Sequence, residues 1–191
     1  MEQHEALCRS IKNIAWGYVL IHLHINIGTL DLLPDWCGYL LFLGALTVIS
    51  NIEPSALLLK PLGILLTVWN GIFWILKALG ISTLGYLPDL IATVISLYFH
   101  FQLLTNIAAV AKANDCPQEG NLLTLRTIRT ILITLFALPF PWAEYEVLSL
   151  LLLIVTLIIT IWICSVLFSM HRYLREHPPE PEVIPDNDFT E

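Results

Sequence analysis

Charged side chains are scarce in this chain of 191 residues. Asp, Glu, Lys and Arg together make up 13% of it, whereas a soluble domain carries roughly a quarter. Hydrophobic residues account for 57%, and the mean hydropathy is +0.74. A polar coat is therefore missing over most of the length, which argues against an ordinary soluble domain and indicates a chain whose natural solvent is the lipid bilayer.

The sequence also lacks the motifs of common enzymes and metal sites. It contains no HExxH, GxSxG, P-loop or GxGxxG motif. The four cysteines form no CxxC pair, and His22 and His24 are too close in sequence to share one face of a helix. No basic patch is present that would attract nucleic acid. We therefore expect no cofactor, no metal ion and no nucleic-acid partner.

The two ends of the chain differ from its middle. Residues 1–11 lack the basic and apolar regions of a cleaved signal, and we expect them to form a cytoplasmic N-terminal segment. Six of the sixteen acidic residues lie in the last sixteen positions, "EHPPEPEVIPDNDFTE". This composition predicts that residues 174–191 form a disordered, acidic, proline-rich cytoplasmic tail.

Between the ends lie six apolar segments, each close to the 20 or so residues that a helix needs to cross a bilayer. They run over 12–30, 35–53, 61–82, 88–111, 124–140 and 145–171. We therefore predict an all-α fold, a polytopic membrane helix bundle within residues 12–173. Its six transmembrane helices would form three hairpins, at about 12–53, 61–111 and 124–171.

The lysines and arginines predict how the bundle is oriented, because cytoplasmic loops of membrane proteins are rich in both. With six spans, one side receives Arg9, Lys12, Lys60, Lys112, Arg126, Arg129, Arg172 and Arg175. We expect this side, and both termini, to be cytoplasmic in a cell membrane. Arg126 and Arg129 are expected to snorkel from the start of the fifth helix. Lys77 is the exception, since it lies inside the third helix towards the opposite end.

An internal repeat accompanies the tripeptide Leu-Pro-Asp, which occurs twice. Segments 17–35 and 71–89 align without a gap. Their shared residues include Gly17 and Gly71, Thr29 and Thr83, Pro34 and Pro88, and Asp35 and Asp89. Proline and aspartate suit the first turn of a helix, so each Leu-Pro-Asp is predicted to start a helix at the non-cytoplasmic surface. The third hairpin has only "ALPFPWAEYE" there, and we interpret it as a degenerate copy.

Polar residues inside the apolar segments recur at helical spacing. In the segment 88–111, Asp89, Thr93, Ser96 and His100 share one face, and in the segment 61–82, Thr67, Asn70, Trp74 and Lys77 share another. An ionisable group within a bilayer is costly and by default indicates a functional site. The simpler alternative is that these groups hydrogen-bond neighbouring helices.

If the polar stripes face each other, they line a cavity open to the non-cytoplasmic side. The residues predicted to line it and bind a ligand are His22, Asn26, Asp31, Asn70, Lys77, Asp89 and His100. A structural ion pair of Lys77 with Asp31 or Asp89 is an equally good explanation of that lysine.

Two resemblances to known proteins are present in the sequence. The stretch "LDLLPDWCGYLLF" resembles a turn of small, uncharacterised multi-pass bacterial proteins, with the pattern Leu-Asp-x-Leu-Pro-Asp-aromatic-x-Gly-Tyr. That resemblance implies a membrane fold and no particular activity. In length and helix count the chain is also similar to substrate-binding subunits of energy-coupling-factor vitamin transporters. Those often carry an alanine-x-x-x-alanine motif in the first helix, where this chain has only Ala15 and Gly17.

Three hypotheses for function follow. The first is a protein that binds or transports a small polar solute, and the convergence of the stripes on one leaflet favours it. The second is an accessory subunit for assembly, immunity or sensing, with a membrane-protein partner and purely structural polar groups. The third is an intramembrane enzyme with a His/Asp site, although the sequence points more towards a protein that is not an enzyme.

Overall fold

The computed structural model describes residues 2–22, 26–27, 30–31, 34–81, 86–138 and 145–178, and within these ranges it leaves the side chains of residues 26, 27, 30, 31, 86 and 146 undescribed. The described residues form six α-helices, one 3-10 helix and two strands of two residues each. In order these are α1 (Glu2–His22), β1 (Asn26–Ile27), β2 (Leu30–Asp31), α2 (Asp35–Ile49), η1 (Pro54–Leu59), α3 (Lys60–Ala78), α4 (Tyr86–Ala113), α5 (Glu119–Ala137) and α6 (Glu146–Glu176). Apart from the single antiparallel pair β1–β2, the predicted all-α fold is confirmed over this part of the chain.

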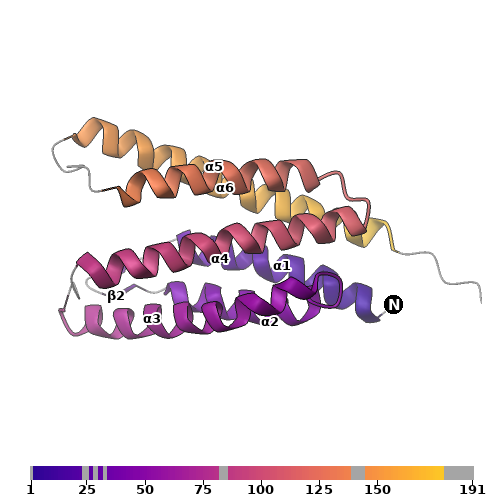
Figure 1. Cartoon of the computed structure of the whole chain (residues 1–191), viewed down its shortest axis with the longest axis horizontal. Helices are drawn as coiled ribbons and strands as arrows, with labels where there is room; N and C mark the ends of the chain where they lie inside the picture. The colour runs from indigo at the N-terminus through magenta and orange to yellow at the C-terminus, as the bar shows by residue number, and fades with distance from the viewer. Residues whose placement is uncertain are drawn as a thin grey trace, which may run out of the picture.

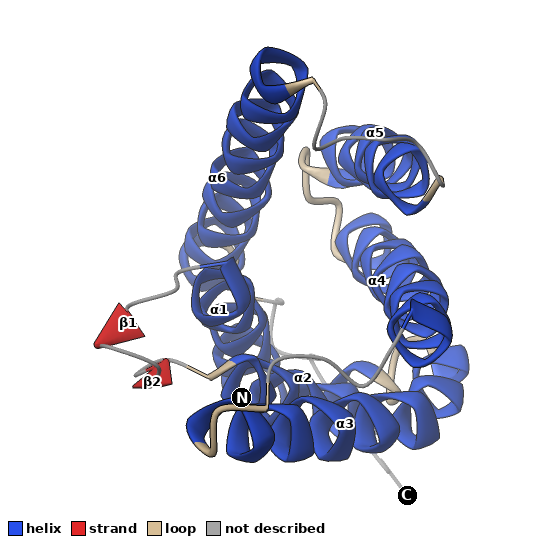
Figure 2. Ribbon diagram, turned by 90° about the vertical axis from the view of Figure 1, so that its left-hand side faces the viewer, coloured by secondary structure: helices blue, strands red, loops and turns tan. Residues whose placement is uncertain are grey.

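The six helices follow one another around a ring. α1 packs against both α2 and α6, α2 against α3, and α4 against α5, while the α3–α4 and α5–α6 contacts are thinner (Figures 1 and 2). The start of α1 and the end of α6 lie at one end of the bundle, which we call the terminal end. The other end, where α2 and α4 begin, is called the cavity end.

The first helix differs from its prediction at both ends. α1 starts at Glu2 and stops at His22, so the predicted segment 12–30 is wrong in its bounds. The early turns are helical because they dock on α6: Leu7 is buried, His4 Nε2 lies 2.7 Å from the Leu174 carbonyl oxygen, and His171 Nδ1 lies 2.9 Å from that of Cys8. Residues 26, 27 and 30, expected in the last turns of this helix, belong to the pair β1–β2 instead.

Both Leu-Pro-Asp sequences lie at helix starts, as predicted. α2 begins at Asp35, directly after Pro34, whose φ of −68° and ψ of 139° are those of an extended residue before a helix. α4 begins at Tyr86, so that Pro88 and Asp89 fall in its first turn. A proline costs no hydrogen bond in either place, because the first N–H groups of a helix have no intrahelical acceptor.

Three helical segments are long and apolar enough to cross a membrane: Pro54–Ala78, Leu87–Ala113 and Val147–Glu176. The helix α2 is apolar but shorter. Large apolar side chains are exposed along them, including Leu58 (73%) and Val147 (81%). A water-soluble surface rarely carries so much contiguous apolar area, so these helices indicate a membrane protein. They support three of the six predicted spans.

The tightest helix crossing joins α1 to α2 through two glycines. A methyl group added to Gly38 would lie 2.7 Å from the Gly17 carbonyl oxygen, and one added to Gly17 would collide with the Phe42 ring. Small residues let helix backbones approach closely in a membrane, where no hydrophobic force drives helices together. Gly71, which matches Gly17 in the predicted repeat, makes no such close contact. The nearest neighbour of a methyl group added there would be Trp36 Cγ, 4.0 Å away.

This crossing predicts the effect of adding one methyl group to α2. Gly38→Ala should lower the free energy of unfolding by about 1–3 kcal/mol, because the clash is with backbone and forces α1 and α2 apart. Gly44→Ala is the matched control on the same helix, since nothing lies within 4 Å of the added atom. Unfolding in detergent micelles measures both, and equal stability of the two variants would contradict the close crossing.

Candidate functional site

A cavity of about 360 Å³ lies inside the bundle towards the cavity end. Its wall is formed by α1, α2, α3, α4 and α5, and it combines apolar side chains such as Trp69 and Phe73 with many polar ones. The polar and aromatic-hydroxyl side chains are Asp35, Tyr39, Asn70, Asp89, Thr93, Ser96, His100 and Arg129. Such a concentration of polar groups inside an apolar bundle marks this cavity as the candidate site.

Hydrogen bonds around His100 build the inner end of the cavity. The His100 Nδ1 atom lies 3.2 Å from the Tyr18 hydroxyl of α1, and its Nε2 lies 3.4 Å from the Tyr39 hydroxyl of α2. The Tyr39 hydroxyl is also 3.1 Å from Ser96 Oγ, so one chain of polar groups joins three helices. Only 1% of His100 is exposed, and both its ring nitrogens have partners, as a buried polar group requires.

Aromatic rings hold this chain of polar groups in place. Phe42 and Phe99 each contact the His100 ring edge to face, with centroids 5.7 and 5.5 Å apart. Tyr18 and Tyr39 pack against Phe42 at 5.2 and 5.9 Å. Because all five of these rings are nearly or fully buried, the imidazole ring has little freedom to leave its position.

The polar face of α4 lines the cavity along its length. Asp89, Thr93, Ser96 and His100 all contribute to the wall, which confirms the prediction that they share one face directed into the bundle. The Thr93 hydroxyl donates to the Asp89 carbonyl oxygen of its own helix at 2.8 Å. The stripe therefore places a carboxylate near the start of α4 and an imidazole three turns deeper.

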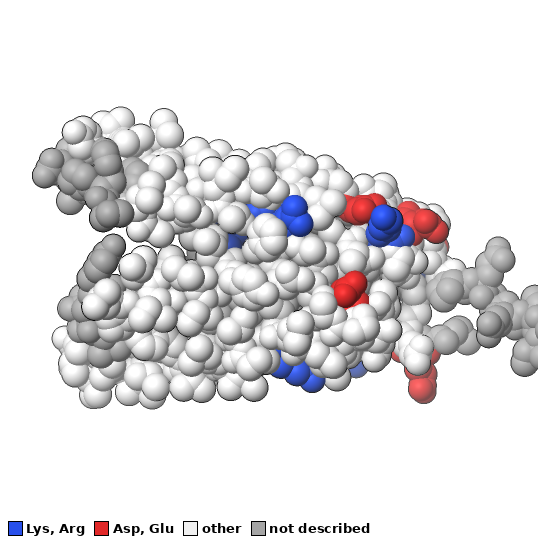
Figure 3. Space-filling view, in the orientation of Figure 1, with Lys and Arg blue, Asp and Glu red and all other residues white. Residues whose placement is uncertain are grey.

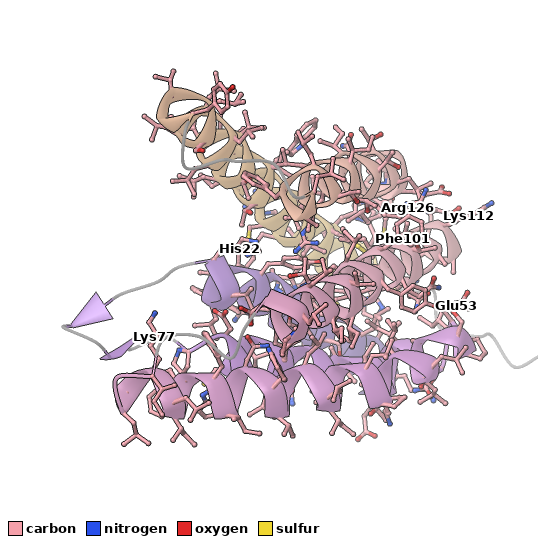
Figure 4. All side chains as sticks on the ribbon, turned by 60° about the vertical axis from the view of Figure 1, so that its left-hand side comes forward. His22, Glu53, Lys77, Phe101, Lys112 and Arg126 are labelled. Atoms are coloured by element: carbon pink, nitrogen blue, oxygen red, sulfur yellow. The ribbon has the colours of Figure 1, made fainter. Side chains whose placement is uncertain are left out.

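The predicted stripe on α3 divides between two environments. Asn70 lines the cavity, and its amide donates to the Leu66 carbonyl oxygen at 2.7 Å. Lys77 is exposed and is absent from the cavity wall; it lies near the end of α3, on the side where β2 contacts that helix (Figure 4).

The other predicted residues come from α1 and the strands. His22 is half-buried outside the cavity wall, with Nδ1 3.0 Å from the Tyr18 carbonyl oxygen and its ring stacked on Tyr18. Asn26 and Asp31 are register partners in the β1–β2 pair, and their side chains fall outside the described part of the structure. The cavity thus brings together Asn70, Asp89 and His100, and leaves His22 and Lys77 outside it. Ligand binding by any of them stays a prediction.

Arg129 is the lining residue that the sequence pattern predicted to lie elsewhere. α5 begins at Glu119 rather than 124, so Arg129 lies in the third turn of the helix and only 9% of it is exposed. It lines the cavity, and its snorkelling towards a membrane surface stays a prediction. Arg126, one turn earlier, donates from Nη1 to Thr105 Oγ1 at 3.2 Å and covers the Phe101 ring at 4.6 Å (Figure 4). Pro117 is the sequence signal that could have indicated this earlier helix start, because α5 begins two residues after it.

The cavity wall carries charged side chains of both signs. Arg129 contributes a positive charge to the wall, and within the described ranges no hydrogen bond or ion pair joins it to another side chain. Asp35 and Asp89 contribute negative charge to the same wall from the starts of α2 and α4. Among the described residues, no group of three or more His, Cys, Asp or Glu side chains could hold a metal ion.

A second, apolar pocket of about 260 Å³ lies between α3 and α4. Leu66, Trp69 and Ala92 line both this pocket and the polar cavity, so they form a shared wall one side chain thick. The thin α3–α4 contact leaves room for this pocket.

Comparison with protein-family models, curated proteins and solved structures found no match for this chain. Its class therefore follows from its own architecture. The long apolar helices are those of a helical membrane protein.

The buried hydrogen bonds predict a stability difference between two tyrosines. Tyr18→Phe should lower the free energy of unfolding by about 1 kcal/mol, since it leaves His100 Nδ1 without its partner. Tyr98→Phe is the control, because Tyr98 is 55% exposed on the outer face of α4. Denaturation in detergent micelles compares them, and an unchanged Tyr18 variant would show that the hydroxyl contributes nothing.

Proposed function

We propose that this protein is a multi-pass membrane protein that binds a small polar solute in the cavity, as part of its transport or uptake. The observation that carries the proposal is the polar lining of a cavity inside a bundle whose outer surface is apolar. A cavity of 360 Å³ falls at the small end of the range typical of ligand sites.

Some polar groups of the wall form no hydrogen bond between helices. Tyr18, Tyr39, Ser96 and His100 satisfy one another, and Asn70 and Thr93 bond to their own helices. Bonds to the same helix add nothing to contacts between helices. The placement of Asn70 and Thr93 on the wall is therefore better explained by a polar ligand than by helix packing alone.

The proposed topology has six spans, three hairpins and both termini in the cytoplasm. Arg9, Lys12, Lys112, Arg172 and Arg175 support it, because they lie in the halves of α1, α4 and α6 nearest the terminal end. On the face shown in Figure 3, charged atoms lie over the middle and the terminal end, whereas the cavity end has none among its described residues. The cavity would then face the non-cytoplasmic side, and the 54-residue repeat would relate the first two hairpins.

Two threonines provide a matched test of solute binding. Thr93 and Thr124 each donate to the carbonyl oxygen four residues back, but Thr93 lines the cavity and Thr124 is exposed. Thermal stabilisation of the purified protein is measured across amino acids, sugars, nucleosides and small acids. For any solute that binds, Thr93→Val should weaken affinity by roughly threefold to tenfold, the loss of about one hydrogen bond. Thr124→Val should leave it unchanged.

If no solute raises the melting temperature, or if both valine variants bind equally well, the cavity is not the binding site.

The topology predicts which introduced cysteines are reached from outside the cell. In a cysteine-free background, Ile81→Cys should react with a membrane-impermeant maleimide on intact cells, and Lys112→Cys only after permeabilisation. Both side chains are exposed, so both should react in detergent. In the natural sequence, burial raises the pKa of the Cys8 thiol, and burial with the nearby Asp115 charge raises that of Cys116 to about 11, so neither reports accessibility well. Labelling of Lys112→Cys on intact cells would show that the orientation is the opposite of the one proposed.

A further inference from the structure

Arg129 combines three properties that seldom occur together. Its side chain is 9% exposed, it lines the polar cavity, and within the described ranges no hydrogen bond or ion pair joins it to another residue. A guanidinium group carries five N–H donors and keeps its charge at any physiological pH. Burying such a charge without a partner is expensive, and more so within a membrane protein.

Arg126 gives a comparison on the same helix, because protein groups hold its guanidinium although its buried Nε has no hydrogen-bond partner. One turn before Arg129, its guanidinium donates to Thr105 and covers the Phe101 ring. Arg129 has no such hydrogen bond or ring contact within the described ranges, and it lines the cavity together with Tyr39 and His100.

We propose that the cavity binds an anionic group, a carboxylate or a phosphate, with Arg129 as its counter-ion. This proposal rests on the proposed function and defines the chemistry of the ligand. A planar guanidinium pairs with either group through two parallel hydrogen bonds, the strongest such contact that a side chain offers.

The rest of the wall limits the charge of the ligand. Asp89 lies eleven residues before His100 on α4, roughly 16 Å at the rise of an α-helix, and it is half-buried beside the cavity. A ligand with several negative charges would be repelled by Asp89 and by Asp35, which lines the same wall. The arrangement therefore suits one anionic group at the inner end, carried by a body that is neutral or positive nearer the mouth.

Two sources could supply that group, a dissolved acid or a lipid headgroup. The apolar pocket between α3 and α4 is separated from the cavity by Leu66, Trp69 and Ala92 alone, and it would accept an acyl chain. The experiment therefore needs one arm for each source.

The full-length protein is purified and its melting temperature is measured in two series. In the first, the probes are acetate, inorganic phosphate and uncharged glycerol, in phosphatidylcholine nanodiscs at constant ionic strength. In the second, nanodiscs of phosphatidylcholine alone are compared with nanodiscs that contain phosphatidic acid. Each series uses the natural sequence, Arg129→Gln, Arg129→Lys and the control Arg126→Gln.

An anion should raise the melting temperature of the natural protein and of Arg126→Gln. Arg129→Gln should bind that anion on the order of tenfold to a hundredfold more weakly, and Arg129→Lys should fall between, because it keeps the charge and loses the planar pair. A shift in the first series identifies a dissolved acid, and a shift in the second alone identifies a lipid. If Arg129→Gln does not fold, the comparison of Arg129→Lys with Arg126→Lys replaces it.

The proposal is overturned if no anion source shifts the melting temperature, or if the shift is equal in the Arg129 and Arg126 variants. Binding of a neutral solute that is lost in Thr93→Val but kept in Arg129→Gln would also overturn it, while leaving the proposed function intact.

Discussion

The hydrogen bonds of His100 are the constraint on which the inner half of the bundle depends. One imidazole ring links Tyr18 of α1 to Tyr39 of α2 from its position on α4, and Phe42 and Phe99 enclose it. Because α4 reaches α2 through few other contacts, this cluster ties the α1–α2 pair to the opposite wall of the ring. The polar groups that close the cavity are thus the same ones that set its shape.

The two sides of the ring are packed with different tightness, and the cavity follows from that difference. Gly17 and Gly38 bring α1 and α2 into backbone contact, while α3 and α4 meet only loosely. Close packing on one side holds the tyrosines rigidly, and the loose side leaves volume for a ligand and for the adjoining apolar pocket. Arg129 lines the remaining space from α5, and within the described ranges no hydrogen bond or ion pair joins it to another side chain.

Helical periodicity predicted the α4 face well. Asp89, Thr93, Ser96 and His100 were placed on one side by spacing alone, and all four line the cavity. Lys77 shows the limit of the same reasoning: it shares a stripe with Asn70 but lies nearly two turns further along α3, outside the cavity wall. Periodicity specifies the face of a helix, whereas depth along the axis depends on how the neighbouring helices are staggered.

The sequence by itself indicated apolar surroundings and the order of the helices, although it missed the pair β1–β2 and the starts of α1 and α5. Too few charges to cover a soluble surface imply apolar surroundings, and Pro34 and Pro88 mark helix starts because proline lacks the N–H that later turns require. Only the tertiary structure decided which polar residues meet. Tyr39 and Arg129 join Asn70, Asp89 and His100 because their four helices surround one cavity. Contacts between residues far apart in sequence leave no local pattern from which this arrangement could be deduced.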